Sequence, residues 1–110
     1  MTNEEALRCL ANKPSDPDGL EALYAHNRTV VDAAIKKWFG RSPVVPQAIR
    51  YVLSRIAARA DAFKPEHQTP DTFVARLVDE ESRLLFEEIE NRLADWRRQG
   101  HANKHIPLGS

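Results

Sequence analysis

Carboxylate and guanidinium side chains are the groups in this sequence most able to do chemistry, and they are concentrated in two segments. The segment "DEESRLLFEEIENRLAD" (79–95) contains seven acidic residues and two arginines, whereas "RYVLSRIAARA" (50–60) contains three arginines and no acid. Two carboxylates held close together could act as general acid and general base. An acidic run of this density is more typical of a helix face exposed to solvent. The run therefore does not predict a catalytic pair.

The cysteine and the histidines are no better placed for catalysis. Cys9 stands beside Leu10 in a helical pattern, where a cysteine is usually a small buried hydrophobe rather than a nucleophile. His101 and His105 have the spacing of helical metal ligands, but "GHANKHIPLGS" offers no cysteine or carboxylate to complete a site. The chain also has no Gly-rich phosphate loop. We therefore expect a protein that is not an enzyme, with no metal site and no cofactor.

The composition is that of one folded helical domain. With 110 residues, 42% of them hydrophobic and 29% charged, the chain can form one modest core. Few glycines and tyrosines among many Ala, Leu, Arg and Glu favour helix over sheet. A single cysteine excludes an internal disulfide framework. Residues 1–15 include Glu4 and Glu5 and no long apolar stretch, so we expect no signal peptide. No apolar run reaches membrane-spanning length, so we expect a cytoplasmic protein with no membrane contact.

The formal net charge is zero, but the charge alternates along the chain. It is −3 for residues 1–27, +5 for 28–63, −5 for 64–95 and +3 for 96–110. Blocks of one sign carry more information about binding partners than about the fold. Residues 28–63 and 64–95 are therefore the segments in which we expect contact surfaces.

Helix start and stop signals define two helices in the first 40 residues. A short helix is predicted from Asn3, as N-cap, to the stop at Pro14. A longer one is predicted from Asp16, as N-cap, with Pro17 in the first turn. Gly40 is well placed to end it, because glycine readily adopts the left-handed conformation found after helices.

Two more helices are predicted in the rest of the chain. One lies within residues 42–63, with Pro46 in its first turn, and the other begins at Thr69 as cap and continues to about residue 98. Its apolar stripe is interrupted at Glu80 and Glu81. Either this helix bends there, with Asp79 capping a second segment, or these two glutamates face water.

The apolar stripes predict both the core and the fold class. They comprise Leu7, Leu10, Leu20, Leu23, Tyr24, Val30, Val31, Ala34, Ile35, Trp38, Ile49, Val52, Leu53, Ile56, Ala60, Phe63, Phe73, Leu77, Leu84, Leu85, Ile89, Leu93 and Trp96. Short connections between the helices favour an all-α fold, a small bundle of three to four helices. We expect one helical domain over residues 1–100, its acidic last helix reaching about residue 98, and a frayed tail at 101–110.

Four segments, in order, resemble region 2 of the sigma-70 family of transcription factors, and in particular its extracytoplasmic-function members. The stretch "NRTVVDAAIKKWFGRS" (27–42) is similar to the first long helix of that region, and "DPDGLEALYAHN" (16–27) is similar to its opening. The stretch "AIRYVLSRIAARADAFKP" (48–65) resembles the second helix, with Asp61, Phe63 and Pro65 at its characteristic end. Finally, "TPDTFVARLV" (69–78) resembles the next helix start, with Phe73 in the tryptophan position.

This resemblance implies a sigma-region-2-like fold over about residues 16–85 and a role in transcription. In working sigma factors the second helix docks on core RNA polymerase through an acidic residue and a glutamine three apart, and this chain has Gln47 and Arg50 at those positions. The family's third helix reads and melts promoter −10 DNA, whereas this chain has the acidic segment from Asp79 onward. Acids facing phosphates lose the counterion release that dominates affinity for nucleic acid.

The leading hypothesis is a stand-alone, degenerate sigma-region-2-like domain that acts through protein contact. Its partner would be core RNA polymerase, a sigma factor or an anti-sigma factor. The acidic helix could occupy a basic surface of the partner, as mimics of nucleic acid do. The expected partner-binding residues are Gln47, Arg50, Arg55, Arg59, Glu80, Glu81, Glu87 and Glu88.

Two other hypotheses stay open. The first is a minimal DNA-binding transcription factor that would set the basic block against phosphates, using Lys36, Lys37, Arg41 and Arg50. The second is a helical adaptor or homodimer with no role in transcription, in which Glu87 and Glu88 meet arginines of a neighbour. Its apolar contact would come from Ile89, Leu93 and Trp96. The simplest expectation for the two oppositely charged helices is that they pair with each other inside the bundle.

Overall fold

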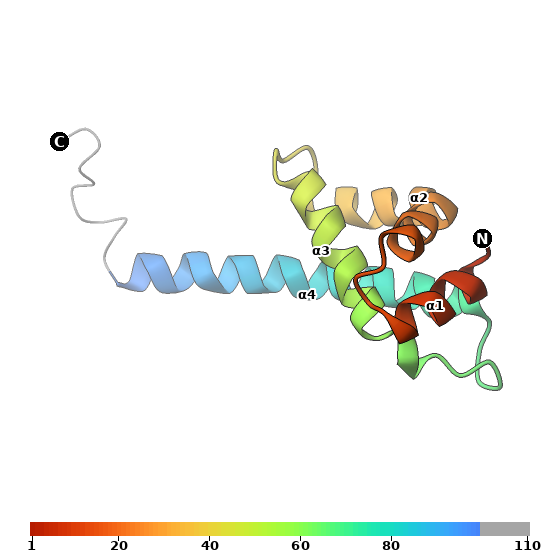
Figure 1. Cartoon of the computed structure of the whole chain (residues 1–110). Coiled ribbons are helices and arrows are strands. Elements are labelled where there is room, and N and C mark those ends of the chain that lie inside the picture. The colour runs from red at the N-terminus through yellow and green to blue at the C-terminus, as the bar shows by residue number, and fades with distance from the viewer. Residues whose placement is uncertain (100–110) are drawn as a thin grey trace.

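The protein is a small all-α bundle, as the sequence predicts. The structure is a computed structural model that describes residues 1–99, and this part of the chain contains four α-helices (Figure 1). They are α1 (Asn3–Asn12), α2 (Pro17–Phe39), α3 (Val45–Ala58) and α4 (Pro70–Arg98), with a short 3₁₀ helix, η1 (Ala60–Ala62), directly after α3. The predicted frayed tail at 101–110, with His101 and His105, lies outside the described residues.

The helix starts follow local capping chemistry. The Asp16 side chain accepts a hydrogen bond from the Gly19 amide at 2.9 Å, and the Thr69 hydroxyl accepts one from Thr72 at 3.2 Å, so both predicted caps are confirmed. The prediction of Asn3 as the first cap was wrong. Thr2 caps α1 in a reciprocal capping box with Glu5, and that leaves Asn3 free to point into the protein.

Two glycines have roles that a side chain would disturb. Gly40 ends α2 with a φ of +60°, in the region that disfavours residues with a Cβ atom. Gly19 lies where α2 meets α1, and a Cβ atom built there would come within 2.9 Å of the Leu10 side chain. The first glycine sets the direction of the chain after α2, and the second allows α1 and α2 to pack closely.

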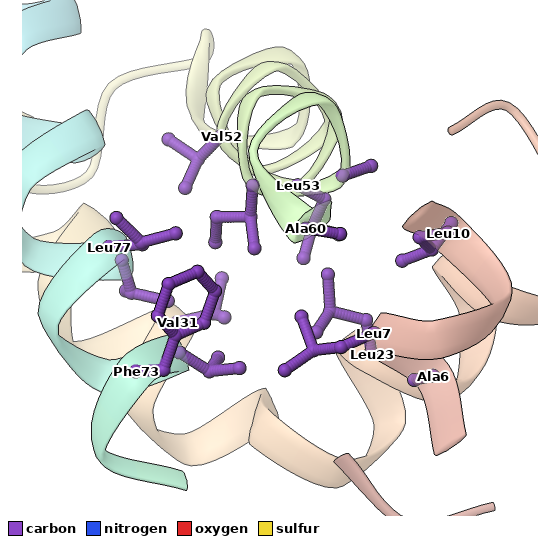
Figure 2. Packing of buried hydrophobic residues seen from close by; sticks show 14 of the residues in the cluster. Ala6, Leu7, Leu10, Leu23, Val31, Val52, Leu53, Ala60, Phe73 and Leu77 are labelled. Carbon is purple, nitrogen blue, oxygen red and sulfur yellow. The ribbon is translucent and has the colours of Figure 1, made fainter. Parts of the chain in front are cut away.

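The core forms where the four helices converge, with Phe73 as its largest side chain (Figure 2). It comprises Ala6, Leu7, Leu10, Leu23, Val31, Ile35, Ala48, Val52, Leu53, Ile56, Ala57, Ala60, Phe73, Val74, Leu77 and Val78. The predicted stripes therefore account for most of the core. They were wrong at four positions that are 42–43% exposed, namely Val30, Leu84, Leu93 and Trp96.

Helix α4 is much longer than the part of it that the bundle covers. Its 29 residues span about 43 Å at 1.5 Å per residue. Its fully buried residues all lie between Phe73 and Ser82. The other helices gather around this first half, and the second half extends beyond them (Figure 1). No helix within residues 1–99 is both long enough and apolar enough to cross a membrane.

Candidate functional site

The arginines of α3 and the first glutamates of α4 form one ion-pair cluster inside the bundle. Arg59 reaches Glu81 at 2.8 Å and Glu80 at 3.1 Å, and Arg55 reaches Glu81 at 3.4 Å. The hydrogen bond from Arg59 to Glu81 raises the pKa of the arginine above its ordinary value. The two helices of opposite charge therefore satisfy each other.

The cluster also corrects both expectations for the interruption at residues 80–81. Helix α4 is continuous from Pro70 to Arg98, so it does not bend at Asp79. Glu81 does not face water, because its side chain is only 5% exposed, whereas that of Glu80 is 34% exposed. The break in the apolar stripe marks a buried carboxylate that is compensated by two arginines, and a partner protein cannot reach Glu81.

The remaining acids of α4 are mostly neutralised as well. Arg83 pairs with Glu87 at 3.3 Å and Arg92 pairs with Glu88 at 2.8 Å, each one turn away on the same helix. Farther along, Arg98 pairs with Asp95. Glu87 and Glu88 are exposed at the surface but already have local partners. The predicted acidic docking surface is thus largely cancelled by the helix's own arginines.

An apolar groove lies between the start of α3 and the middle of α4. It has a volume of about 300 Å³ and is lined by Val44, Gln47, Ala48, Tyr51, Leu85 and Ile89. Val44 is 43% exposed and Tyr51 is 41% exposed, so large apolar groups form the walls and reach the surface. Of the predicted partner-binding residues, only Gln47 lines this groove. We call it the α3–α4 groove.

The sequence carried a signal for this groove that the stripe pattern alone did not identify. Val44, Ala48 and Tyr51 follow the spacing i, i+4 and i+7, which places them on one side of α3. Ala48 also belongs to the buried stripe of this helix, together with Val52 and Ile56. The apolar side of α3 is therefore wider than its buried part, and it leaves Val44 and Tyr51 at the surface. Of the groove-forming residues, Val44, Ala48 and Tyr51 were not predicted as contacts for a protein partner.

The basic residues proposed for DNA contact are partly committed elsewhere. Lys37 lies 3.8 Å from Asp79 and 5.4 Å from the centre of the Trp38 ring. Lys36, Arg41 and Arg50 are exposed, and none of them makes an ion pair within residues 1–99. Arg50 lines a second pocket of about 270 Å³ with Tyr24, Pro46, Ile49 and Leu53. Three unpaired cations therefore remain for a phosphate backbone.

A buried amide pair connects α1 to α2 and reaches the start of α4. Asn3 and Asn27 exchange two hydrogen bonds, of 3.0 and 2.6 Å, and the Asn3 amide also donates to Asp71 at 2.7 Å. Asn27 has non-helical backbone angles, and its side chain donates to the carbonyl of Leu23. These contacts satisfy the polar groups fully within the protein, so this pair is a structural device.

The end of α2 packs on α4 through aromatic rings. Trp38 and Phe39 lie 5.5 and 5.7 Å from Phe86, measured between ring centres. The indole nitrogen of Trp38 is buried and has no hydrogen-bond partner within residues 1–99. These rings close the bundle at the point where α4 leaves it.

The thiol of Cys9 is held by a carboxylate. It donates a hydrogen bond to Asp16 at 2.8 Å, which raises the pKa of Cys9 and lowers that of Asp16. A thiol held in its protonated form is a poor nucleophile. Within residues 1–99, no group of three His, Cys, Asp or Glu side chains is placed to hold a metal ion.

In comparisons with known proteins, no protein-family model, no curated protein and no solved structure matches this chain.

Proposed function

We propose that this chain is a non-catalytic protein-binding module of the transcription machinery, and that the α3–α4 groove is its contact surface. The observation that carries the proposal is the apolar lining of this groove, with Val44 and Tyr51 as exposed walls. Contiguous apolar surface of this kind is typical of sites that a protein partner covers.

The groove has the composition of an interface centre. Aromatic residues dominate the energetics of such centres, and Tyr51 supplies one at the edge of the groove. Gln47 adds a polar group that can fix the orientation of a partner, and Arg50 lies exposed less than one turn away. An apolar groove with one polar edge suits an amphipathic helix.

The choice of partner rests on the resemblance to sigma region 2. Gln47 and Arg50 occupy the positions through which the family's second helix contacts core RNA polymerase, and in this chain both are exposed on α3. Core RNA polymerase, a sigma factor or an anti-sigma factor is therefore the proposed partner. The ion pairs along α4 argue against an acidic surface that imitates nucleic acid, because its charges are already compensated.

A pair of matched valine variants tests the groove. Val44→Asp places a charge on the groove wall, whereas Val30→Asp places the same charge on α2, and the two valines are 43% and 42% exposed. Val44 directly precedes α3 and is exposed, and a negative charge is favourable at a helix N-terminus, so the fold should tolerate the change. We expect Val44→Asp to weaken binding to core RNA polymerase or an isolated sigma or anti-sigma factor at least tenfold, as hot-spot changes do. Val30→Asp should have no effect.

The binding titration should also include a −10 promoter single strand as a ligand, at physiological salt. Saturable binding of the labelled chain to one of the protein partners, lost in Val44→Asp, supports the proposal. Equal affinities for both variants would remove the groove from the site. Binding only to a −10 promoter single strand, with affinity falling steeply as salt rises, would replace the proposal with the DNA-binding alternative.

A further inference from the structure

The second half of α4, residues 87–98, has an incomplete set of ion pairs. From Arg83 to Arg98, the charged residues form three local pairs, Arg83–Glu87, Arg92–Glu88 and Arg98–Asp95. Glu90 and Arg97 are the two charged residues of this stretch with no ion pair within residues 1–99. Neither has an opposite charge three or four positions away in the sequence, so their own helix cannot satisfy them.

An apolar stripe runs along the same half of α4. Ile89, Leu93 and Trp96 follow the spacing i, i+4 and i+7, which aligns them on one side of the helix. Leu93 is 42% exposed, and Ile89 at the other end also lines the α3–α4 groove. Helix α4 extends beyond the other helices (Figure 1). The stripe therefore continues the apolar side of α4 past the end of the bundle.

The stripe and the charges of Glu90 and Arg97 are each centred within half a residue of Leu93. Ile89 and Trp96 stand four positions before and three after it, while Glu90 and Arg97 stand three before and four after. An antiparallel two-fold axis through Leu93 places Leu93 beside its own copy, and it brings Ile89 of one chain within about one residue of the level of Trp96 of the other. The same axis brings Glu90 of one chain to Arg97 of the other, twice.

We infer that the second half of α4 binds the same segment of a second copy of this chain, antiparallel, with the two-fold axis at Leu93. Glu90 and Arg97 are seven positions apart, so they lie on the same flank of the helix. A two-fold rotation lays this flank on its own copy in reverse order, and each unpaired charge then meets its opposite. A parallel pair would keep Glu90 and Arg97 about 10 Å apart along the axis, so these two charges would not meet.

The size of the contact fixes the strength to expect. Residues 87–98 overlap for about 18 Å, with three large apolar side chains from each chain. The area that so short a contact buries is at or below the roughly 1,200–2,000 Å² of stable interfaces. The dimer should therefore be weak, with a dissociation constant of about micromolar or higher. Dimer formation does not depend on the proposed partner, although both surfaces include Ile89.

Exchanging the charges of Glu90 and Arg97 tests the antiparallel arrangement. The full chain is measured by sedimentation equilibrium from about 1 to 500 µM. The wild-type chain should pass from monomer to dimer across this range. Glu90→Arg and Arg97→Glu should each weaken the dimer about three- to tenfold, because like charges then meet across the axis. The double exchange restores opposite charges and should return the affinity to within about twofold of wild type.

A matched leucine pair tests the position of the axis. Leu93→Glu sets two carboxylates against each other and should leave a monomer throughout the concentration range. Leu84→Glu changes a leucine that is equally exposed, at 43%, but lies off the stripe, and it should dimerise like the wild type. A wild-type chain that stays monomeric at 500 µM would overturn the inference. So would a double exchange as weak as the single ones, or loss of the dimer in Leu84→Glu.

Discussion

Glu80 and Glu81 are neighbours in the sequence with different physical surroundings. Glu81 is buried, and its two oxygens meet Arg55 and Arg59. Glu80 forms its one ion pair within residues 1–99 with Arg59, and its side chain remains partly in water. Removing one partner of a buried pair leaves an uncompensated charge, whereas a surface pair contributes little.

Replacing each glutamate by alanine should therefore have unequal effects. For Glu81→Ala we expect a loss of about 3 kcal/mol of unfolding free energy, the low end for buried pairs, because the arginines reach water. For Glu80→Ala we expect a loss of less than about 1 kcal/mol. Urea unfolding followed by circular dichroism measures both. Equal losses would mean that Glu81 is as well solvated as its neighbour.

At the scale of elements, the amide pair explains how a kinked helix and a short helix hold each other. The Asn27 side chain donates to the Leu23 carbonyl, the acceptor that a regular helix reserves for the backbone amide of the same residue. The backbone departs from helical angles at this point. Helix α1, only ten residues long, gains from Asn27 a buried polar anchor that its own sequence could not provide.

A double-mutant cycle on the pair measures this anchor. Asn3→Ala and Asn27→Ala should each lower the unfolding free energy by about 1–3 kcal/mol, because each leaves a buried amide without its partner. The double variant should lose clearly less than the sum, since no orphaned partner remains. Thermal and urea unfolding provide the values. Additive losses would show that the two amides act independently.

At the scale of the whole molecule, the bundle and the second half of α4 are separate in their energetics. Core residues of α4 end at Ser82, and the last partly buried contacts with the bundle include Leu85 and Phe86. The rest of the helix adds no buried apolar side chain to the core. Folding stability and the exposed stripe should therefore respond to different changes.

Shortening the chain tests this separation. A chain of residues 1–88, measured at low micromolar concentration, should lose less than about 1 kcal/mol, which corresponds to a fall in melting temperature of no more than about 4–8 °C. A chain of residues 1–80 lacks Glu81, Ser82 and Leu85 and should not fold. Calorimetry distinguishes the two. A large fall for the longer chain would place part of the core beyond Glu88.

Local signals in the sequence predicted the helices. The features that the sequence did not predict depend on contacts between residues far apart in the chain. Asp16, Thr69 and Gly40 act within a few residues, so their roles were predictable. The burial of Glu81 depends on arginines 22 and 26 positions away, and the inward turn of Asn3 depends on Asn27. Of the groove, Gln47 was predicted as a contact, and so was Ile89 in the adaptor alternative. Val44, Ala48 and Tyr51 were not predicted as contacts for a protein partner.

The exposed end of the apolar stripe shows the same limit. The periodicity that correctly placed Leu77 in the core continues through Leu93 and Trp96, which the bundle does not cover. A helical period of apolar residues indicates that one side of the helix is buried in a contact. It does not show whether that contact is made within the same chain or with another one.

The placement of the two tryptophans gives the protein two optical reporters. Trp38 lies against Phe86, and its indole nitrogen is shielded from water, so its fluorescence reports whether the bundle is intact. Trp96 is on the second half of α4 and is 43% exposed, so its emission responds to whatever covers the stripe. Indole emission shifts to shorter wavelength as water is excluded. With Trp38→Phe and Trp96→Phe variants, intrinsic fluorescence can distinguish unfolding from association without any added label.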